Sequence, residues 1–180
     1  MTREEILPTL GRALLECLEE VAPGRSQEMR DVYRAYQVRT HDTIVTLFPG
    51  TRETLERLKE AGFGLGVVTS KGLIVASEGL NLFNLMPLFD VLVTYEDSTL
   101  HKPNPDPLLV ACEQLSIEPA QALYVGDAVV DIQAGKAAGT QTAGVTWGAG
   151  TRLEIEKASP DYIFEQMADV LRLVPAVVAK

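Results

Sequence analysis

The strongest constraint on the fold is that five short segments after residue 48 are apolar at almost every position, rather than at every second one. A strand reads this way when both faces of its sheet are covered. Segments with helical spacing separate these runs, and helical crossovers join neighbouring strands in parallel. The pattern predicts an α/β fold with a parallel sheet covered on both faces. The apolar runs are 65–69, 91–94, 122–125, 142–145 and 162–164, and the helical segments are 51–61, 73–80, 108–115 and 131–138.

The N-terminal part has a different pattern. Apolar residues at helical spacing predict one helix over 2–22, interrupted in its first turns by Pro8, and a second over 26–41 with Ser26 as candidate N-cap. No apolar strand lies between them, so we expect a helical hairpin. The change of pattern near 43–48 predicts two parts: a helical piece at 1–43 and an α/β domain at 44–180.

Charge and composition exclude several partners. The chain has 16 basic and 25 acidic residues, a net charge of −9, and no basic cluster, so we expect no nucleic acid partner. No apolar run approaches the roughly 20 residues that span a bilayer, and the N-terminus has no signal-peptide pattern. We therefore expect no membrane association and a cytoplasmic location, with Cys17 and Cys112 as free thiols. An anionic substrate would need a local cation in this acidic chain.

The first candidate site group is the hydroxyl pair Thr69 and Ser70, which leaves an apolar run and enters a helical segment. Ligands of parallel sheets bind outside the carboxyl ends of the strands. Hydroxyls and helix N-terminal N–H groups at such a place suit phosphate oxygens. The alternative is that the pair only caps the following helix.

The second candidate is Lys102, in the segment HKPNPDP at 101–107. Three prolines at alternate positions stiffen this segment. Between residues 91 and 150 the only other Lys or Arg is Lys136, against seven acidic residues. An isolated cation on a stiff loop is suited to neutralise a bound anion or neighbouring carboxylates. The alternative is an ordinary surface lysine.

The third candidate is a pair of carboxylates, Asp127 and Asp131, which follow an apolar run and Gly126. Residues four apart face the same way when they lie on a helix. Two carboxylates at a strand end form a hard oxygen site suited to Mg²⁺. The alternative is that acidic residues here complement a helix N-terminus, which explains one of the two.

In this order the three groups resemble the haloacid dehalogenase superfamily. The segment VVTSK at 67–71 is similar to its second motif, Lys102 in HKPNPDP to its third, and GDAVVD at 126–131 to its fourth. The resemblance covers essentially the whole chain and is strongest to the phosphoglycolate phosphatase and pyrophosphatase-like branch. It implies a Rossmann-like core carrying a partial helical cap, with residues 2–42 similar to the later cap helices.

The resemblance also implies roles. Thr69 would bind the transferring phosphoryl group with Ser70 beside it, and Lys102 would stabilise nucleophile and phosphate. Asp127 would be a Mg²⁺ ligand, with Asp131 supporting the metal directly or through water. Ser70 stands where asparagine is common in this branch. The implied activity is Mg²⁺-dependent hydrolysis of a small phosphorylated metabolite, a phosphoglycolate-like monoester, through an aspartyl-phosphate.

One departure limits this expectation. The superfamily's first motif, Asp-x-Asp-Gly-Thr on its first strand, supplies the nucleophile and a general acid/base, and it occurs nowhere in the 180 residues. We therefore expect little or no turnover from this chain alone. In the superfamily that strand lies between the strands that here end at Thr69 and Val125. Its absence would leave two rows of unpaired backbone groups or let these strands close up.

Three explanations follow: a truncated phosphatase, a fragment stabilised by a partner or by dimerisation, or a non-catalytic module that binds a phosphorylated ligand or a protein. The four retained groups, Thr69, Lys102, Asp127 and Asp131, favour the first. We expect a homodimer through the free sheet edge or the exposed face of the cap. A nucleotide-binding domain is disfavoured, because neither G-x-G-x-x-G nor a Walker-type loop follows any apolar run.

Overall fold

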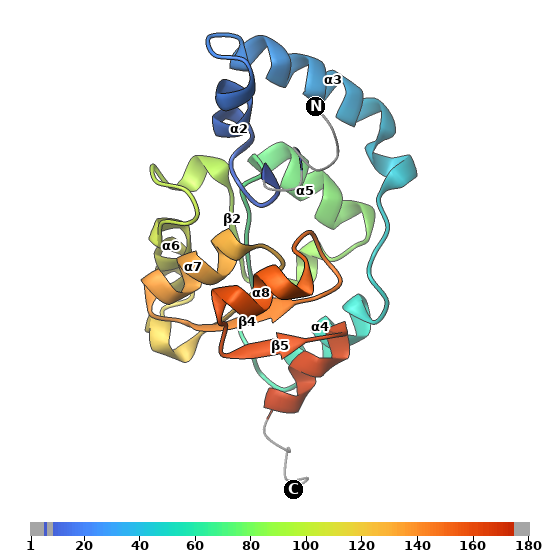
Figure 1. Ribbon diagram of the computed structural model, residues 1–180. Helices are drawn as coiled ribbons and strands as arrows, with labels where there is room; N and C mark the ends of the chain where they lie inside the picture. Colours follow the sequence, from blue (N-terminus) through green and yellow to red (C-terminus); the bar gives the residue numbers. More distant parts are fainter. Residues whose placement is uncertain (1–5, 7–8, 175–180) are drawn as a thin grey trace, which may run out of the picture.

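Helices and strands alternate along the chain as the apolar runs predict, in a computed structural model that describes residue 6 and residues 9–174 (Figure 1). The α-helices are α2 (Leu14–Val21), α3 (Ser26–Ile44), α4 (Thr51–Glu60), α5 (Leu73–Leu82), α6 (Asp106–Gln114), α7 (Val129–Ala138) and α8 (Arg152–Ala158). The strands are β1 (Gly66–Val68), β2 (Val91–Val93), β3 (Leu123–Gly126), β4 (Gln141–Val145) and β5 (Tyr162–Phe164). The 3₁₀ helices are η2 (Met86–Leu88), η3 (Tyr95–Asp97), η4 (Pro119–Gln121) and η5 (Met167–Leu173).

All strand pairings in the described residues are parallel, as predicted, but they form two sheets. β1 pairs with β2, with Val67 opposite Leu92. β3 pairs with β4 and β4 with β5. No ladder joins β1 to β3 among the described residues, so a two-stranded sheet lies beside a three-stranded one. Of the two outcomes expected without the superfamily's first strand, the structure has the first: β1 and β3 do not pair with each other, and no other described strand pairs with their facing edges.

The carboxyl ends of β1 and β3 nevertheless lie close together, because residues that follow each strand lie against Gly11. The Ser70 hydroxyl, just after β1, donates to the Gly11 carbonyl at 2.8 Å. A β-carbon placed on Gly11 would lie 2.9 Å from the β-carbon of Ala128, just after β3. The candidate site groups that follow these two strands are therefore gathered at one end of the molecule.

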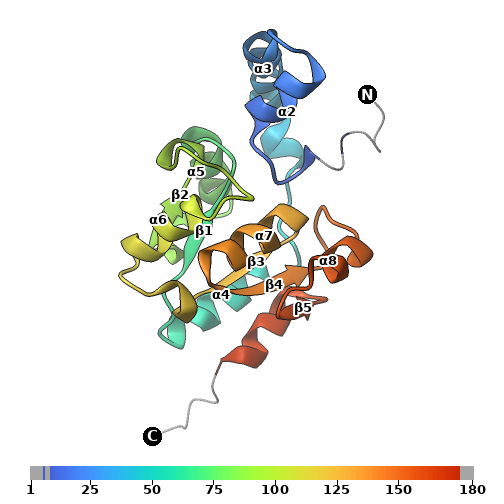
Figure 2. The same ribbon diagram turned by 60° about the vertical axis from the view of Figure 1, so that its left-hand side comes forward.

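Helices bridge the two sheets. α6 packs against β1 and β2, α7 packs against β3 and β4, and α6 and α7 pack against each other (Figure 2). α4 packs against η5 and η2. The core is correspondingly divided, because parallel strands covered by helices bury apolar side chains beneath each helix. Its three clusters are Val91, Val93 and Ala111; Leu108, Ala134 and Ala138; and Ala143, Val145 and Phe164.

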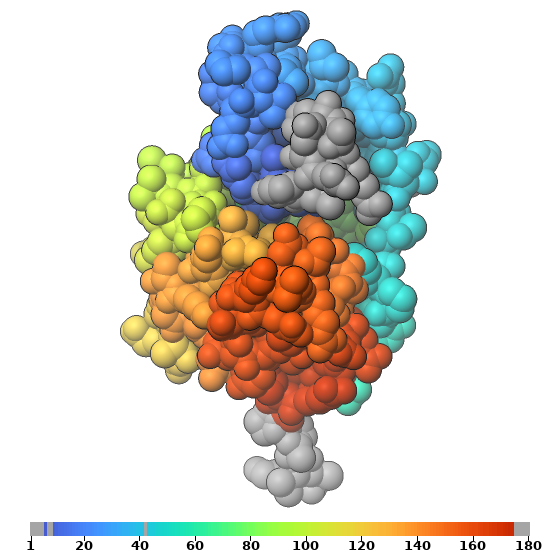
Figure 3. Space-filling view, viewed as in Figure 1, coloured from blue at the N-terminus to red at the C-terminus, as the bar shows by residue number. Residues whose placement is uncertain are grey.

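The N-terminal helices α2 and α3 pack against each other as a hairpin, drawn in blue at the end of the molecule opposite η5 (Figure 3). The helix predicted over 2–22 is shorter in the described residues: α2 begins at Leu14. Residues 1–5 and 7–8, with Pro8, lie outside the described part of the chain. Gly11 adopts a φ of 84°, which ends any continuous helix before α2.

Both cysteines, Cys17 and Cys112, are free, as predicted, and both are buried. Burial raises the pKa of each thiol. Among the described helices, none is both long enough and apolar enough to cross a membrane.

Candidate active site

Lys102 and Asp131 form the centre of the site. Lys102 follows η3 and precedes α6, and Asp131 lies in the first turn of α7. The ammonium Nζ lies 2.6 Å from Asp131 Oδ1, and only 7% of Lys102 and 3% of Asp131 is exposed. The surface-lysine interpretation is therefore wrong. A buried charge is stable only when it is paired, and each of these residues supplies the other's counter-charge.

Tyr124 completes this pair. Its hydroxyl oxygen lies 3.2 Å from Lys102 Nζ and 3.2 Å from Asp131 Oδ1. The Lys102 Nζ atom also lies 5.9 Å from the centre of the Tyr124 ring, within the range of a cation–π contact. Burial of the phenol, reinforced by the charge and hydrogen bond of Asp131, holds the pKa of Tyr124 well above its usual range. The hydroxyl is therefore neutral at neutral pH and can both donate and accept.

The two carboxylates predicted to hold the metal are anchored by backbone N–H groups. Asp131 Oδ2 accepts from the Ala128 N–H at 3.0 Å, so Asp131 also caps α7, as the alternative interpretation of this motif expected. Asp127 Oδ2 accepts from the Ala149 N–H at 2.8 Å. Gly126 and Gly148 permit this, because a β-carbon on either would lie 2.2 Å from Asp131 Cβ or Asp127 Cβ, respectively.

The donor chemistry of these carboxylates fits Mg²⁺. Asp127 Oδ1 accepts no hydrogen bond from the described residues, and Asp131 Oδ2 accepts only one. Mg²⁺ is commonly held by one or two carboxylates while it keeps several waters. Within the described part of the chain, no group of three or more His, Cys, Asp or Glu side chains could hold a metal ion. The described residues thus offer two carboxylates, so a cation held by them would need further ligands from outside this set.

The two hydroxyl residues after β1, Thr69 and Ser70, make different hydrogen bonds. Thr69 Oγ1 accepts from the Lys71 N–H at 3.2 Å, and no described acceptor takes its own hydroxyl proton. Ser70 instead donates its proton to Gly11 at 2.8 Å. Neither residue caps α5, whose N-cap is Gly72, and the Leu73 N–H donates to Glu96. The helix-cap interpretation is therefore wrong, and Thr69 is the member of the pair with a free donor.

The structure thus brings two of the predicted residues, Lys102 and Asp131, into direct contact. Among the described contacts none links Thr69 or Asp127 to this pair, although each lies at the carboxyl end of a strand beside it. Tyr124 was not singled out from the sequence. Its signal was a polar ring in an otherwise apolar run, two residues before the glycine of the fourth motif.

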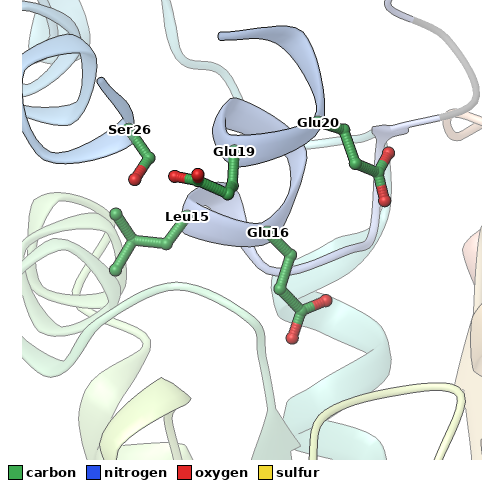
Figure 4. Close-up of a pocket in the computed structure, with 5 residues that line it drawn as sticks. All are labelled: Leu15, Glu16, Glu19, Glu20 and Ser26. Carbon is green, nitrogen blue, oxygen red and sulfur yellow. The ribbon is translucent and has the colours of Figure 1, made fainter. Parts of the chain in front are cut away.

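A separate hollow of about 520 Å³ lies in the N-terminal hairpin. Its lining residues are Leu15, Glu16, Glu19, Glu20 and Ser26. Glu19 points toward Ser26, whereas Glu16 and Glu20 point away from it (Figure 4). The lining includes no cation, so this hollow does not suit an anionic substrate and is distinct from the Lys102–Asp131 site.

Comparison with known proteins gives concordant results. The sequence matches the profile of the haloacid dehalogenase-like hydrolases over residues 1–145. Pyrophosphatase PpaX of Bacillus velezensis is 39% identical over 171 residues, or 95% of this chain and 79% of that protein. A solved structure from Haemophilus somnus, described as a predicted phosphoglycolate phosphatase, matches with TM-score 0.84 and 26% identity, over 97% of this chain and 84% of its own. A haloacid dehalogenase-superfamily hydrolase from Geobacter sulfurreducens matches with TM-score 0.71 and 29% identity, over 97% and 79%.

Proposed function

Because the chain belongs to the haloacid dehalogenase-like hydrolase family, we propose that its site serves the Mg²⁺-dependent hydrolysis of a small phosphate monoester resembling phosphoglycolate. The overall reaction breaks the ester P–O bond: water supplies an oxygen to phosphate and a proton to the leaving alcohol. The relatives named pyrophosphatase and phosphoglycolate phosphatase support a phosphoryl substrate with a small leaving group.

The observation that carries this proposal is the buried ammonium of Lys102 at the carboxyl ends of the strands. A chain with a net charge of −9 repels a phosphate ester at long range. A desolvated cation attracts an anion much more strongly than one in bulk water does. Asp131 neutralises much of the Lys102 charge. Lys102 would therefore act on an anionic substrate mainly as a charged hydrogen-bond donor through its remaining N–H, and a bound Mg²⁺ would supply further positive charge.

The other residues have complementary roles. Thr69 donates its free hydroxyl proton to a phosphate oxygen. Asp127 and Asp131 would hold Mg²⁺, which, when bound, neutralises charge on the phosphate oxygens. Ser70 would contribute a second donor by releasing the Gly11 carbonyl. We propose that Lys102 and Thr69 bind the phosphate group at the ends of β1 and β3, and that Mg²⁺, which Asp127 and Asp131 would hold, would contact its oxygens.

The nucleophile is the one group for which the 180 residues offer no candidate of the family's form, because Asp-x-Asp-Gly-Thr is absent from them. We propose that this chain by itself binds phosphate and forms little or no aspartyl-phosphate. A second function, a non-catalytic module that binds a phosphorylated ligand, is favoured by the same observation, because Lys102 and Thr69 need no nucleophile to hold an anion.

The experiment compares hydrolysis of p-nitrophenyl phosphate with Mg²⁺ and with EDTA. The 180-residue chain is tested beside a longer polypeptide in which a strand bearing Asp-x-Asp-Gly-Thr precedes Met1. The phosphatase proposal expects turnover only in the longer polypeptide, lost in Lys102→Ala. Lys136→Ala is the control for removal of a surface lysine, because Lys136 is exposed and donates to the Ala158 carbonyl. Turnover that survives Lys102→Ala overturns the proposal, and phosphate binding without turnover in both polypeptides establishes the binding module.

A further inference from the structure

We infer that Tyr124 is a positioning residue for Lys102: its hydroxyl, together with Asp131, fixes the direction in which the ammonium presents its remaining N–H to a bound anion. The inference rests on the proposed function, because it assumes that the Lys102 ammonium receives the anion. Tyr124 itself is not proposed to touch substrate.

The Lys102 ammonium has one N–H without a partner among the described residues. An ammonium has three N–H groups. One is directed at Asp131 Oδ1, at 2.6 Å, and one at Tyr124 Oη, at 3.2 Å. No third acceptor for Lys102 is found among the described residues. Two partners on different elements restrict the rotation about the Cε–Nζ bond, so the third N–H is limited to a narrow range of directions.

Lys102, Asp131 and Tyr124 are each in contact with the other two. The Tyr124 hydroxyl accepts from Lys102 and can donate its own proton to Asp131 Oδ1, at 3.2 Å. Its other acceptor, the Val68 carbonyl, is more distant at 3.5 Å. Each member thereby fixes the other two, and removing the phenol oxygen leaves Lys102 with a single partner.

The Tyr124 side chain is more rigidly held than that of Lys102. The Tyr124 ring is mounted on β3 and packs against the cluster of Leu108, Ala134 and Ala138. A tyrosine has two side-chain torsions, whereas the lysine head group sits on a flexible four-carbon stem. The ring therefore holds its hydroxyl in place, and the hydroxyl restrains the more mobile ammonium.

Packing alone does not explain the hydroxyl. A phenylalanine would fill the same apolar cluster and would keep the ring beneath the ammonium, at 5.9 Å. The hydroxyl's two closer partners are both predicted site residues, Lys102 and Asp131. The polar atom of Tyr124 thus serves the site, while its ring serves the core.

The test uses Tyr124→Phe in the 180-residue chain, with Tyr162→Phe as matched control, since the Tyr162 ring stacks on Phe164 away from Lys102. The first readout is the resolved ¹⁵N–¹H signal of the Lys102 ammonium and its hydrogen-exchange rate. The second is the Kd of inorganic phosphate with Mg²⁺ present. We expect Tyr124→Phe to speed ammonium exchange and to weaken phosphate binding on the order of fivefold. Tyr162→Phe should change neither quantity.

An unchanged ammonium signal in a folded Tyr124→Phe protein overturns the inference, as does a changed signal with an unchanged phosphate Kd. If the unaltered chain binds no phosphate, the proposed function fails, and the ammonium exchange rate alone then decides whether Tyr124 orients Lys102. Should Tyr124→Phe not fold, the unaltered protein still provides the test. A slowly exchanging Tyr124 hydroxyl proton with a nuclear Overhauser contact to the Lys102 ammonium supports the inference, and its absence overturns it.

Discussion

Lys102 Nζ and Asp131 Oδ1 lie 2.6 Å apart, although 29 positions separate the two residues along the chain. Both side chains are almost fully buried. At this depth the two charges are strongly interdependent, because neither can be solvated by water once the other is removed. The pair is therefore the part of the site whose disruption should be felt throughout the fold.

We predict that Lys102→Met lowers the free energy of unfolding by about 3–5 kcal/mol, because it leaves the Asp131 carboxylate buried without a counter-charge. Urea unfolding measures the change. The double variant Lys102→Met with Asp131→Leu should recover a large part of the loss, because it removes both charges. The exposed pair of Arg152 and Glu156, at 2.8 Å, is the matched control, and Arg152→Met should have little effect. A Lys102→Met protein as stable as the parent would contradict the prediction.

Gly11→Ala should destabilise the protein by about 2–4 kcal/mol. Its φ of 84° is costly for alanine, by about 1 kcal/mol. The added β-carbon would also lie 2.9 Å from the Ala128 β-carbon and 3.1 Å from Val130 Cγ2, and overpacking adds about 1–3 kcal/mol. Thermal or urea unfolding gives the value.

Gly24→Ala separates the cost of the backbone conformation from the cost of the close contacts at Gly11. Gly24 has a similar φ of 76°, and beyond its chain neighbours no atom lies within 4 Å of its added β-carbon. We expect a cost of about 1 kcal/mol there. Equal losses in the two variants would show that the loop at Gly11 does not press against the residues that follow β3.

Stability should fall on acidification, in part through Asp161. The Thr142 backbone N–H donates to Asp161 Oδ2 at 2.8 Å and the Thr142 hydroxyl at 2.9 Å, and these bonds lower the pKa of Asp161. A carboxyl whose pKa is lower in the folded state stabilises the protein above its unfolded pKa of about 3.9. That contribution is lost as the pH falls through the folded pKa.

Asp161→Asn should therefore destabilise the protein more at about pH 7 than at about pH 3. Urea unfolding of parent and variant at both pH values measures the difference. An equal loss at the two pH values would mean that the Thr142 contacts do not favour the ionised form of Asp161.

The free edges of β1 and β3 predict self-association at high concentration, because unpaired strands are templates for pairing with another chain. Val125, on β3, is 37% exposed. Val125→Lys should shift the equilibrium toward monomer, since a lysine on an edge opposes pairing. Size-exclusion chromatography with light scattering measures it. Leu153→Lys is the control, on the exposed surface of α8, and a parent chain that remains monomeric would contradict the prediction.

The sequence was sufficient to predict those parts of the fold where pattern and burial coincide. The apolar runs at 65–69 and 91–94 became β1 and β2, and the helical segment at 131–138 became α7, which ends before Gly139, at a φ of 80°. α8 was not predicted, although Thr151 and Glu154 form a capping box that marks its start. Its seven residues are too few to show a helical period.

The site was predictable by residue type and less so by contact. Lys102 was expected to neutralise a bound anion or neighbouring carboxylates, and Asp131 to support a metal. The structure shows that the two residues pair with each other. That pairing depends on how α6 and α7 pack, which no local pattern encodes. Tyr124 was missed because an aromatic residue in an apolar run is ordinarily core. Only the arrival of Lys102 from another connection gives its hydroxyl a partner.

The interrupted sheet also bears on how the protein opens. No main-chain ladder crosses from β1 to β3 in the described residues, so within this part of the chain the two sheets are joined by helix packing and by contacts such as those of Lys102 and Tyr124. Lys102 comes from the connection after β2, whereas Tyr124 belongs to β3 and Asp131 to α7. The site thus connects the β1–β2 sheet to the β3–β4–β5 sheet, and we expect these two units to unfold in separate steps. Amide hydrogens of the two units would then exchange at two different rates. An anion bound at the Lys102–Asp131 site would slow the exchange of both units.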